Sequence, residues 1–366
     1  MVLHYTLFQG NEFGNGAYRR SFQITSLLES LNENVLTISQ HPVEKNDTSF
    51  YERLKLAYHY LKFIDFSNIN LHKLRYKVLD IVLWKKYLQT LKKSNENLIV
   101  VYELTYYSDD SLVFACQDLG IEIIGILHNI ESLVHNQKSL KSDHLAPNWF
   151  QEEIKLLRTF SSIFTISREE QWLLNLYHID ATYLPYVPSK NVRDTCLKVR
   201  SLRQDVDKSF YLTIGTASNQ PTIDGFKELI TIFEILKLKE ELLIGGYDTD
   251  KLASYLNNKE ANIRLLGSLN DKQLQDVLIN CKAIFIHQKP TTGALTKIPE
   301  LLLSGIPVIC NTASARNYYY HKGLYVYDTA KELESLLNDP KILSNFDFIL
   351  ENKNEVLLRK IQYRNA

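Results

Sequence analysis

The sequence is poor in the features that build metal centres, disulfide frameworks and strong electric fields. Its 366 residues include only four cysteines, and none of them forms a CxxC pair or lies near a cluster of histidines. This spacing argues against a disulfide framework and a structural zinc site, and it favours a reducing compartment. The 42 basic and 42 acidic residues give no net charge. A neutral chain has no global field that would gather nucleic acid, so any binding of anions has to be local.

Several motifs are also missing. The first residues, MVLHYTLFQG, show no basic stretch followed by a long apolar run, so we expect no signal peptide, no membrane span and a cytoplasmic location. No GxSxG elbow occurs, which disfavours a serine hydrolase. The DTD triplet at 248–250 precedes a helix-like segment, and no other carboxylate cluster suggests magnesium. We therefore expect neither a metal nor a cofactor.

Short apolar runs alternate with helix-like segments along the whole chain, and Gly, Pro or Asn bound most of them. Such runs are typical of strands buried on both faces. The predicted strands are 3–8, 34–38, 97–103, 121–129 and 162–167 in the first half, and 209–215, 241–246, 262–267, 283–287 and 307–311 in the second. This alternation predicts an α/β fold with two Rossmann-like doubly wound domains.

The segment LPYVPSKNVRDTCLKVRSLRQDVDKS, residues 184–209, separates the two series of strands and has little apolar periodicity. It is the best candidate for a connection between domains. The predicted divisions are a first domain at 1–187, a linker at 188–204, a second domain at 205–340, and a helical segment at 341–366 that packs back on the first domain. Open sheets bind ligands at the carboxyl ends of their strands, so the expected site is a cleft between the two domains.

The segment from Tyr51 to Lys93 is strongly basic, with ten Lys or Arg residues against three acidic ones and eight interleaved aromatics. The simpler interpretation is a solvated face over an ordinary core. The alternative is a surface that rests on anionic lipid, which would give peripheral contact with the inner membrane face. No recognition motif accompanies the charge, so we expect no nucleic-acid partner.

A short stretch places one lysine and one glutamate at the head of an otherwise apolar helix: TTGALTKIPELLLSGIPVICN, residues 291–311. Thr296 is expected as the N-cap, and Gly305 is expected to close the helix. The helix dipole disfavours a cation at the position of Lys297 unless an anion binds there. Lys297 and free N–H groups would suit a diphosphate, and Glu300 would accept hydrogen bonds from ribose hydroxyls. The alternative is a surface ion pair worth a few tenths of a kcal/mol.

Two glycine-rich turns follow predicted strands, one in each half. Gly215 and Thr216 come after the strand at 209–215. The loop in FQGNEFGNGAYRRSF, residues 8–22, contains Gly14 and Gly16 but not the GxGxxG pattern, so a dinucleotide fingerprint is absent. Each turn is a candidate phosphate or sugar loop.

Taken in order, these pieces resemble the GT-B glycosyltransferases, most closely the retaining family 4 and its relatives. The resemblance covers nearly the whole chain and is strongest from Ser209 to Asn311, where YLTIGTASNQP, LLIGG, NIRLLGSLNDKQLQDVLINCKAIFIH and TGALTKIPELLLSGIPVICN follow in the family's order. FTISREEQWLL and YLPYVP match the end of the family's first domain.

The resemblance implies that the second domain holds a nucleoside-diphosphate sugar. Lys297 would contact the diphosphate, Glu300 the ribose, and the backbone from Gly267 to Leu269 the nucleobase. The donor-binding residues implied are Gly215, Thr216, Gly267, Ser268, Leu269, Thr292, Gly293, Ala294, Lys297 and Glu300.

The resemblance also implies that the first domain binds the acceptor, a glycan or a lipid-linked molecule. Gly14 and Gly16 would lie near the transferred sugar, and His128, at the end of a predicted strand, would lie near the reacting carbon. Glu103, also at a strand end, is a candidate for orienting the acceptor hydroxyl or simply a capping or surface acid. His128, Lys297 and Glu300 are the predicted catalytic residues.

Two positions depart from the family pattern. Thr292 stands where relatives often have a glutamate, and Thr216 stands where they often have an arginine. Lys289 is the candidate cation that would compensate. The predicted function is hexosyl transfer in polysaccharide or glycolipid biosynthesis, with retention as the expected outcome. The alternatives are a non-catalytic partner of an active transferase and a sugar-nucleotide epimerase.

Overall fold

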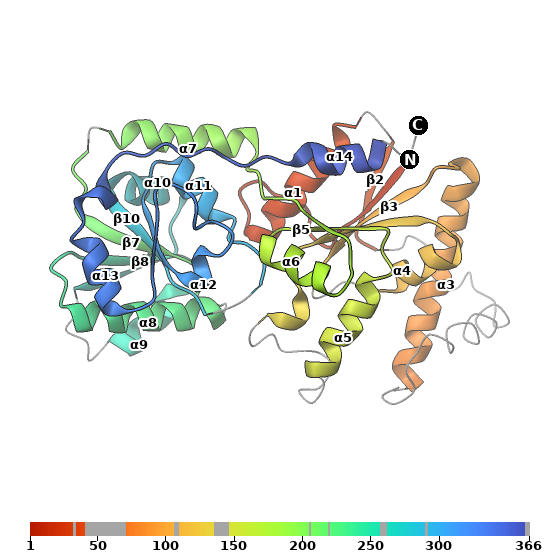
Figure 1. Ribbon diagram of the computed structural model, residues 1–366, viewed down its shortest axis with the longest axis horizontal. Helices are drawn as coiled ribbons and strands as arrows, with labels where there is room; N and C mark the ends of the chain where they lie inside the picture. The colour runs from red at the N-terminus through yellow and green to blue at the C-terminus, as the bar shows by residue number, and fades with distance from the viewer. Residues whose placement is uncertain are drawn as a thin grey trace. The chain divides into compact units, whose positions relative to one another are not determined.

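The protein consists of two compact α/β units, each built on its own sheet (Figure 1). The computed structural model describes residues 1–31, 34–40, 71–105, 110–134, 146–204, 206–218, 220–256, 262–289 and 292–362. The first unit comprises Met1–Ser132, His144–Pro185 and Lys353–Ala366, and the second comprises Leu133–Asp143 and Tyr186–Asn352. The predicted pair of Rossmann-like doubly wound domains is confirmed.

The first sheet has six parallel strands in the order β2-β1-β3-β4-β5-β6. Its strands are β1 (Val2–Tyr5), β2 (Val35–Ile38), β3 (Ile99–Leu104), β4 (Glu122–Leu127), β5 (Ser162–Thr165) and β6 (Ala181–Tyr183). Its helices are α1 (Gly16–Glu29), α3 (Leu71–Ser94), α4 (Ser111–Asp118), α5 (Ala146–Leu157), α6 (Arg168–Leu176) and α14 (Asn354–Gln362), with a 3-10 turn η3 (Glu131–Leu133).

Alternation along the strands divides the core of the first unit into two layers. On β3, Val100 and Tyr102 pack with side chains of α3, α4, α5 and α6. Ile99 and Val101 point to the other face and pack with side chains of α1 and α14. Successive residues of a strand face opposite sides of a sheet, so a run that is apolar at every position requires helices on both faces.

The second sheet also has six parallel strands, in the order β12-β11-β10-β7-β8-β9. Its strands are β7 (Phe210–Ile214), β8 (Leu242–Gly245), β9 (Ile263–Gly267), β10 (Cys281–Ile286), β11 (Val308–Asn311) and β12 (Leu324–Tyr327). Its helices are α7 (Lys190–Leu202), α8 (Gln220–Leu236), α9 (Ala253–Leu256), α10 (Asp271–Asn280), α11 (Lys297–Leu303), α12 (Thr312–Ala315) and α13 (Ala330–Leu337), with 3-10 turns η5 (Thr249–Leu252) and η6 (Pro340–Leu343). One core layer contains side chains of α7 and α11, and the other contains side chains of α8 and α13.

All ten predicted strands are present, but the sequence reading missed two more. β6 and β12 are edge strands of three and four residues. Each pairs with one neighbour only, and the half-buried residues Thr182 in β6 and Tyr325 and Val326 in β12 weaken the continuous apolar pattern that marks a strand buried on both faces.

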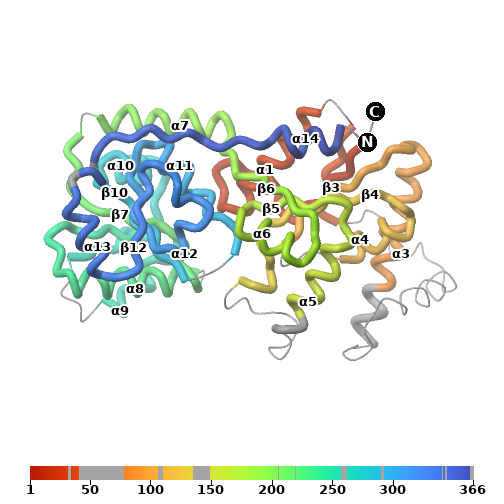
Figure 2. Tube along the Cα trace, viewed as in Figure 1, coloured from red at the N-terminus to blue at the C-terminus, as the bar shows by residue number. Residues whose placement is uncertain are grey.

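The segment predicted as a linker at 188–204 contains helix α7, which packs on α10 and α11 of the second unit (Figure 2). Val192, Cys196 and Val199 are buried. Their spacing of four and three residues forms one narrow helical face. Charged residues surround this face, which is why the segment reads as polar when its composition is averaged.

The last helix belongs to the first unit. α14 packs beside α1 (Figure 1), and Leu357 and Ile361 are completely buried in the same layer as Ile24 and Leu28. The final segment of the chain therefore completes a core that the first residues begin.

We expect Leu357→Ala to lower the free energy of unfolding by about 2–5 kcal/mol, because it leaves a cavity in this layer. The matched control is Val356→Ala on the same helix, whose side chain is 39% exposed; its effect should stay within about 0.5 kcal/mol. Urea unfolding of both variants gives the comparison, and equal midpoints would contradict the packing of α14 described here.

Candidate functional site

Each sheet has one point at which consecutive strands leave in opposite directions. In the first sheet, β2 and β3 lie on opposite sides of β1, and in the second sheet β8 and β10 lie on opposite sides of β7. Open α/β sheets bind ligands outside the carboxyl ends of their strands at such switch points. A ligand site is therefore expected beside the residues that follow β1 and β3, and beside those that follow β7 and β10.

A buried carboxylate occupies the switch point of the first sheet. Glu103 on β3 lies between His4 on β1 and His128, which follows β4. The Nε2 atom of His4 is 2.7 Å from Oε1 of Glu103, and the Nε2 atom of His128 is 2.7 Å from Oε2. The hydroxyl of Ser21 on α1 also donates to Oε2. Protein groups therefore occupy both oxygens of this carboxylate.

The network keeps Glu103 ionised. Burial alone would raise the pKa of the carboxyl group, but the hydrogen bonds and charges of His128 and His4 outweigh it and hold the pKa of Glu103 well below its usual range. An ionised carboxylate only accepts hydrogen bonds, so the Nε2 atom of His128 carries a proton. In the neutral ring, Nδ1 is then the acceptor nitrogen.

Only one member of this group reaches the surface. The side chains of His4 and Glu103 are 0% exposed, whereas that of His128 is 6% exposed. Glu103 was predicted to orient the acceptor hydroxyl or to be a capping or surface acid. The structure buries it as the hydrogen-bond partner of His4 and His128, so it is not a surface acid, and a role toward the acceptor stays a prediction. Its partners could not be read from the sequence, because the two histidines come from other parts of the chain.

The loop with Gly14 and Gly16 is fixed by local contacts. The side chain of Asn15 caps α1 by accepting hydrogen bonds from two amides of the first turn, at 3.1 and 3.3 Å. Arg19 Nε donates to the carbonyl of Gly14 at 2.7 Å. A Cβ on Gly14 would lie 2.7 Å from that of Tyr18, so close packing excludes a side chain there. Gly16 is the first residue of α1 and is exposed. A role for this loop beside the transferred sugar stays a prediction.

In the second unit, Lys297 reaches the switch point. It begins α11, and its Nζ donates to the carbonyl of Ile214, the last residue of β7, at 2.9 Å. Its side chain therefore ends next to the turn of Gly215 and Thr216. Burial lowers the pKa of the Lys297 ammonium group to about 8. A bound anion would favour the charged form and oppose this shift.

Glu300 lies one turn along the same helix. Tyr186 Oη donates to its Oε1 at 2.7 Å, a contact that the sequence did not reveal. The prediction that Thr296 caps α11 is wrong, because Thr296 has helical angles of φ −56° and ψ −25° and makes no capping hydrogen bond. A capping side chain needs an extended backbone to turn back on the first amides. Gly305, with φ +66°, follows the end of the helix as predicted.

The other predicted donor residues lie along the same carboxyl edge of the second sheet, after β7, after β9 and between β10 and α11. They are Gly215, Thr216, Gly267, Ser268, Leu269, Thr292, Gly293 and Ala294. Gly215 is closely packed, because a Cβ there would lie 2.7 Å from Thr222. Gly267 needs φ +67°, which favours glycine. Thr216 and Ser268 are exposed. The roles of these residues stay predictions.

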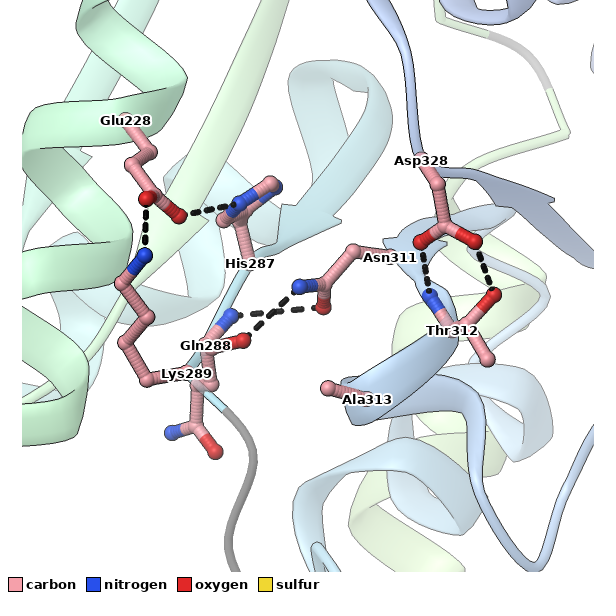
Figure 3. A pocket seen from close by; sticks show the side chains of 8 residues that line it. All are labelled: Glu228, His287, Gln288, Lys289, Asn311, Thr312, Ala313 and Asp328. Atoms are coloured by element: carbon pink, nitrogen blue, oxygen red, sulfur yellow. Dashed lines mark hydrogen bonds and ion pairs between the residues drawn. The ribbon is translucent and has the colours of Figure 1, made fainter. Parts of the chain in front are cut away.

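A second charged cluster follows β10, and it lines a cavity of ≈ 470 Å³ in the second unit (Figure 3). Lys289 pairs with Glu228 of α8, and the other oxygen of Glu228 is 3.1 Å from His287 Nε2. The Nδ1 atom of His287 is 2.9 Å from the hydroxyl of Tyr327. Lys289, the candidate replacement for a missing cation, thus has an acidic partner within the unit.

The basic segment was predicted from residues 51–93, of which 51–70 lie outside the described residues. In α3, Lys85 forms an ion pair with Asp118, and Lys92 donates to the carbonyl of Leu119 at 2.6 Å. Trp84 and Leu88 of the same helix are buried. Lys85 and Lys92 therefore hold α3 against the end of α4 and the turn that follows it, and contact of this segment with a membrane stays a prediction.

Two features are absent from the part of the chain that the structure describes. In the ranges given above, no three His, Cys, Asp or Glu side chains are grouped so that they could hold a metal ion. None of the helices described above has the length and apolar character needed to cross a membrane.

No protein-family model and no curated protein sequence matches this chain. Solved structures do match. Sucrose-phosphate synthase from Thermosynechococcus elongatus has a TM-score of 0.58 at 12% identity, covering 99% of this chain and 94% of that one. A UDP-forming α,α-trehalose-phosphate synthase from Burkholderia vietnamiensis has a TM-score of 0.58 at 9% identity, covering 99% and 93%. The UDP-GlcNAc 2-epimerase from Methanocaldococcus jannaschii has a TM-score of 0.52 at 15% identity, covering 99% and 100%. The chain has the GT-B fold.

Glu103→Gln keeps the shape of the side chain but removes its charge. One amide oxygen would replace the two carboxylate oxygens that now accept from His4 and His128, so we expect the free energy of unfolding to fall by about 2–4 kcal/mol. Because folding lowers the pKa of Glu103, its contribution is present above about pH 4.5 and is lost as the pH falls below that value. Urea unfolding from about pH 7 to about pH 3 should therefore show a smaller loss of stability in the variant than in the wild type.

The control for this series is Glu29→Gln on the exposed side of α1, for which we expect a change within about 0.5 kcal/mol. Identical pH profiles for the wild type and Glu103→Gln would contradict the shared hydrogen-bond network.

Lys297 should make stability rise with pH. Its pKa is about 8 in the folded chain, and its ordinary value of 10.5 applies to the unfolded chain. Between these two pH values the unfolded chain therefore binds more protons than the folded one. Stability then increases with pH by at most about 1.4 kcal/mol per pH unit. Lys297→Met should lose this increase, as measured by urea unfolding at several pH values in that window. Parallel curves for the two proteins would show that the ammonium group is not desolvated.

Proposed function

We propose that this chain is a glycosyltransferase that moves a sugar from a nucleoside diphosphate to a hydroxyl group of a glycan or lipid-linked acceptor. The observation that carries the proposal is the position of Lys297. Its ammonium group lies at the switch point of the second sheet, beside Ile214 and the turn of Gly215 and Thr216. A cation and backbone amides at the carboxyl end of β7 suit the diphosphate of a nucleotide sugar.

The GT-B fold also supports a nucleoside-diphosphate sugar as the donor. A trehalose-phosphate synthase that forms UDP and an epimerase of UDP-GlcNAc share it over nearly their whole lengths. The acceptor class and retention of configuration are proposed from the resemblance to family 4. The cytoplasmic location is proposed from the sequence features described above, and contact with the inner membrane face from the basic segment 51–93.

In the proposed reaction, the bond between the anomeric carbon and the diphosphate oxygen breaks as the acceptor oxygen bonds to that carbon, and the proton of the acceptor hydroxyl passes to an oxygen of the departing diphosphate. Lys297 stabilises the negative charge that develops on the departing diphosphate. Glu300, oriented by Tyr186, accepts hydrogen bonds from the ribose. His128, oriented by Glu103, offers Nδ1 to a hydroxyl of the acceptor or of the transferred sugar. These groups need no metal ion for the roles assigned to them.

A sugar-nucleotide epimerase is the second candidate, because the UDP-GlcNAc 2-epimerase matches 99% of this chain. The two candidates differ in their need for an acceptor. An epimerase converts the donor when it is alone, whereas a transferase releases the nucleoside diphosphate faster when the acceptor is present. A non-catalytic partner, the reading suggested by Thr292, would bind without turnover.

The test is a thermal-shift screen with UDP-, GDP-, TDP- and ADP-sugars, followed by turnover assays with and without acceptor glycans. We expect one nucleotide series to stabilise the chain by a few kcal/mol at concentrations well above its dissociation constant. Lys297→Met should weaken binding of that donor about 10- to 100-fold, as expected for loss of a charged hydrogen bond. Lys251→Met is the control, because this lysine is 67% exposed and pairs with Asp248. The absence of any shift, or equal affinity in the wild type and Lys297→Met, would exclude the proposed donor site.

A further inference from the structure

The loop between β10 and α11 is held by an arginine from another segment. Arg316 follows α12, and its Nε donates to the carbonyl of Gly293 at 3.0 Å. One terminal nitrogen donates to the carbonyl of Thr292 at 2.9 Å, and the other donates to the carbonyl of Ala313. The guanidinium group therefore ties two consecutive residues of the loop to α12.

The other end of the loop is held from the same segment (Figure 3). Asn311, at the end of β11, donates from Nδ2 to the carbonyl of Gln288 at 2.7 Å, and its Oδ1 accepts from the amide of Gln288 at 3.3 Å. The same oxygen caps α12 by accepting from Ser314 at 3.1 Å. Asn311 and Arg316 thus hold the loop at two places. Asn311 binds it at Gln288, where it leaves β10, and Arg316 binds it at Thr292 and Gly293, before α11.

These contacts also fix the direction of the loop's N–H groups, because the peptide bond is planar and trans. In such a peptide the C=O group of one residue and the N–H group of the next point in opposite directions. Because the carbonyls of Thr292 and Gly293 face Arg316, the N–H groups of Gly293 and Ala294 point away from it. Gly293 has φ +76°, the left-handed conformation found in backbone nests, which bind anions through successive N–H groups. No described residue accepts a backbone hydrogen bond from Ala294.

We propose that Arg316 is a positioning residue that presents the amides of Gly293 and Ala294 to the phosphate or sugar oxygens of a nucleoside-diphosphate sugar. This inference rests on the proposed function and adds a residue that acts through the loop and does not touch the substrate. Backbone amides would supply the contacts, so the loop can bind oxygen atoms although Thr292 carries no carboxylate. An arginine suits this role, because its planar guanidinium group donates to three carbonyls at once and a lysine ammonium group does not have that geometry.

The proposal is tested with Arg316→Met and Arg316→Lys, using Arg264→Met as the control because Arg264 is a 59% exposed partner of Glu241 on the surface. Hydrogen–deuterium exchange is followed in peptides that contain residues 292–297, without ligand and with UDP. We expect bound UDP to slow this exchange about tenfold in the wild type and in the control, and to slow it little in either Arg316 variant. If Arg316→Met does not fold, Arg316→Lys carries the comparison.

Kinetics with the donor found in the screen supply the second readout. Lost orientation of amides that bind a developing charge should lower kcat about 10- to 100-fold, with a smaller change in the KM of the donor. Methylguanidinium added to Arg316→Ala should restore part of the lost kcat, and it should have no such effect on the control. Wild-type slowing of exchange by UDP in the Arg316 variants, or loss of that slowing with wild-type kcat and KM, overturns the proposal.

The two proposals fail in different ways. If the wild-type chain neither binds nor turns over any nucleotide sugar, the proposed function fails, and the role assigned to the loop amides falls with it. If the wild type is active and the Arg316 variants keep its kcat and KM, only the role of Arg316 is wrong.

Discussion

The second unit depends on a lysine ammonium group held against the end of a central strand. Nζ of Lys297 meets the carbonyl of Ile214, where the strand order of the sheet reverses. Burial makes the charged form costly there, so the site is poised for a compensating negative charge. Three features of α11 hold Lys297 in this position. α11 starts at the lysine, its apolar face is anchored by Ile298 and Leu302, and Gly305 ends the helix before β11.

The first unit also buries an ionised side chain at its switch point, but one of the opposite charge. At its switch point a carboxylate is the buried ion, and Glu103 is stabilised by His4, His128 and Ser21. Each of these partners comes from a different part of the fold. The network therefore also ties together β1, β3, the residue after β4, and α1. A single buried charge is expensive, and the dense hydrogen bonding around it is what makes it tolerable. Both units thus place one desolvated ion at the position where such sheets bind ligands.

The sequence predicted the two-domain architecture and ten of the twelve described strands, because apolar runs buried on both faces are the strongest local signal in a chain. It failed where the signal was weak or depended on distant partners. The edge strands β6 and β12 were not predicted, and the narrow buried face of α7 was masked by the charged residues around it. At the site, Lys297 and Glu300 were found from their unusual place at a helix start. The partners Tyr186, His4 and Arg316 were missed, because nothing local marks a side chain whose contact lies far away in the chain.

The first unit is discontinuous in the chain, since it needs Lys353–Ala366 in addition to residues before Tyr186. During synthesis the ribosome releases the second unit's residues before α14 has been made. The apolar strip formed by Ile24 and Leu28 therefore stays uncovered by Leu357 and Ile361 until the residues of α14 have been made. Domains generally fold in the order in which they emerge. Here the first unit begins before the second and is completed after it, and a nascent chain stalled before residue 353 would offer that strip to chaperones.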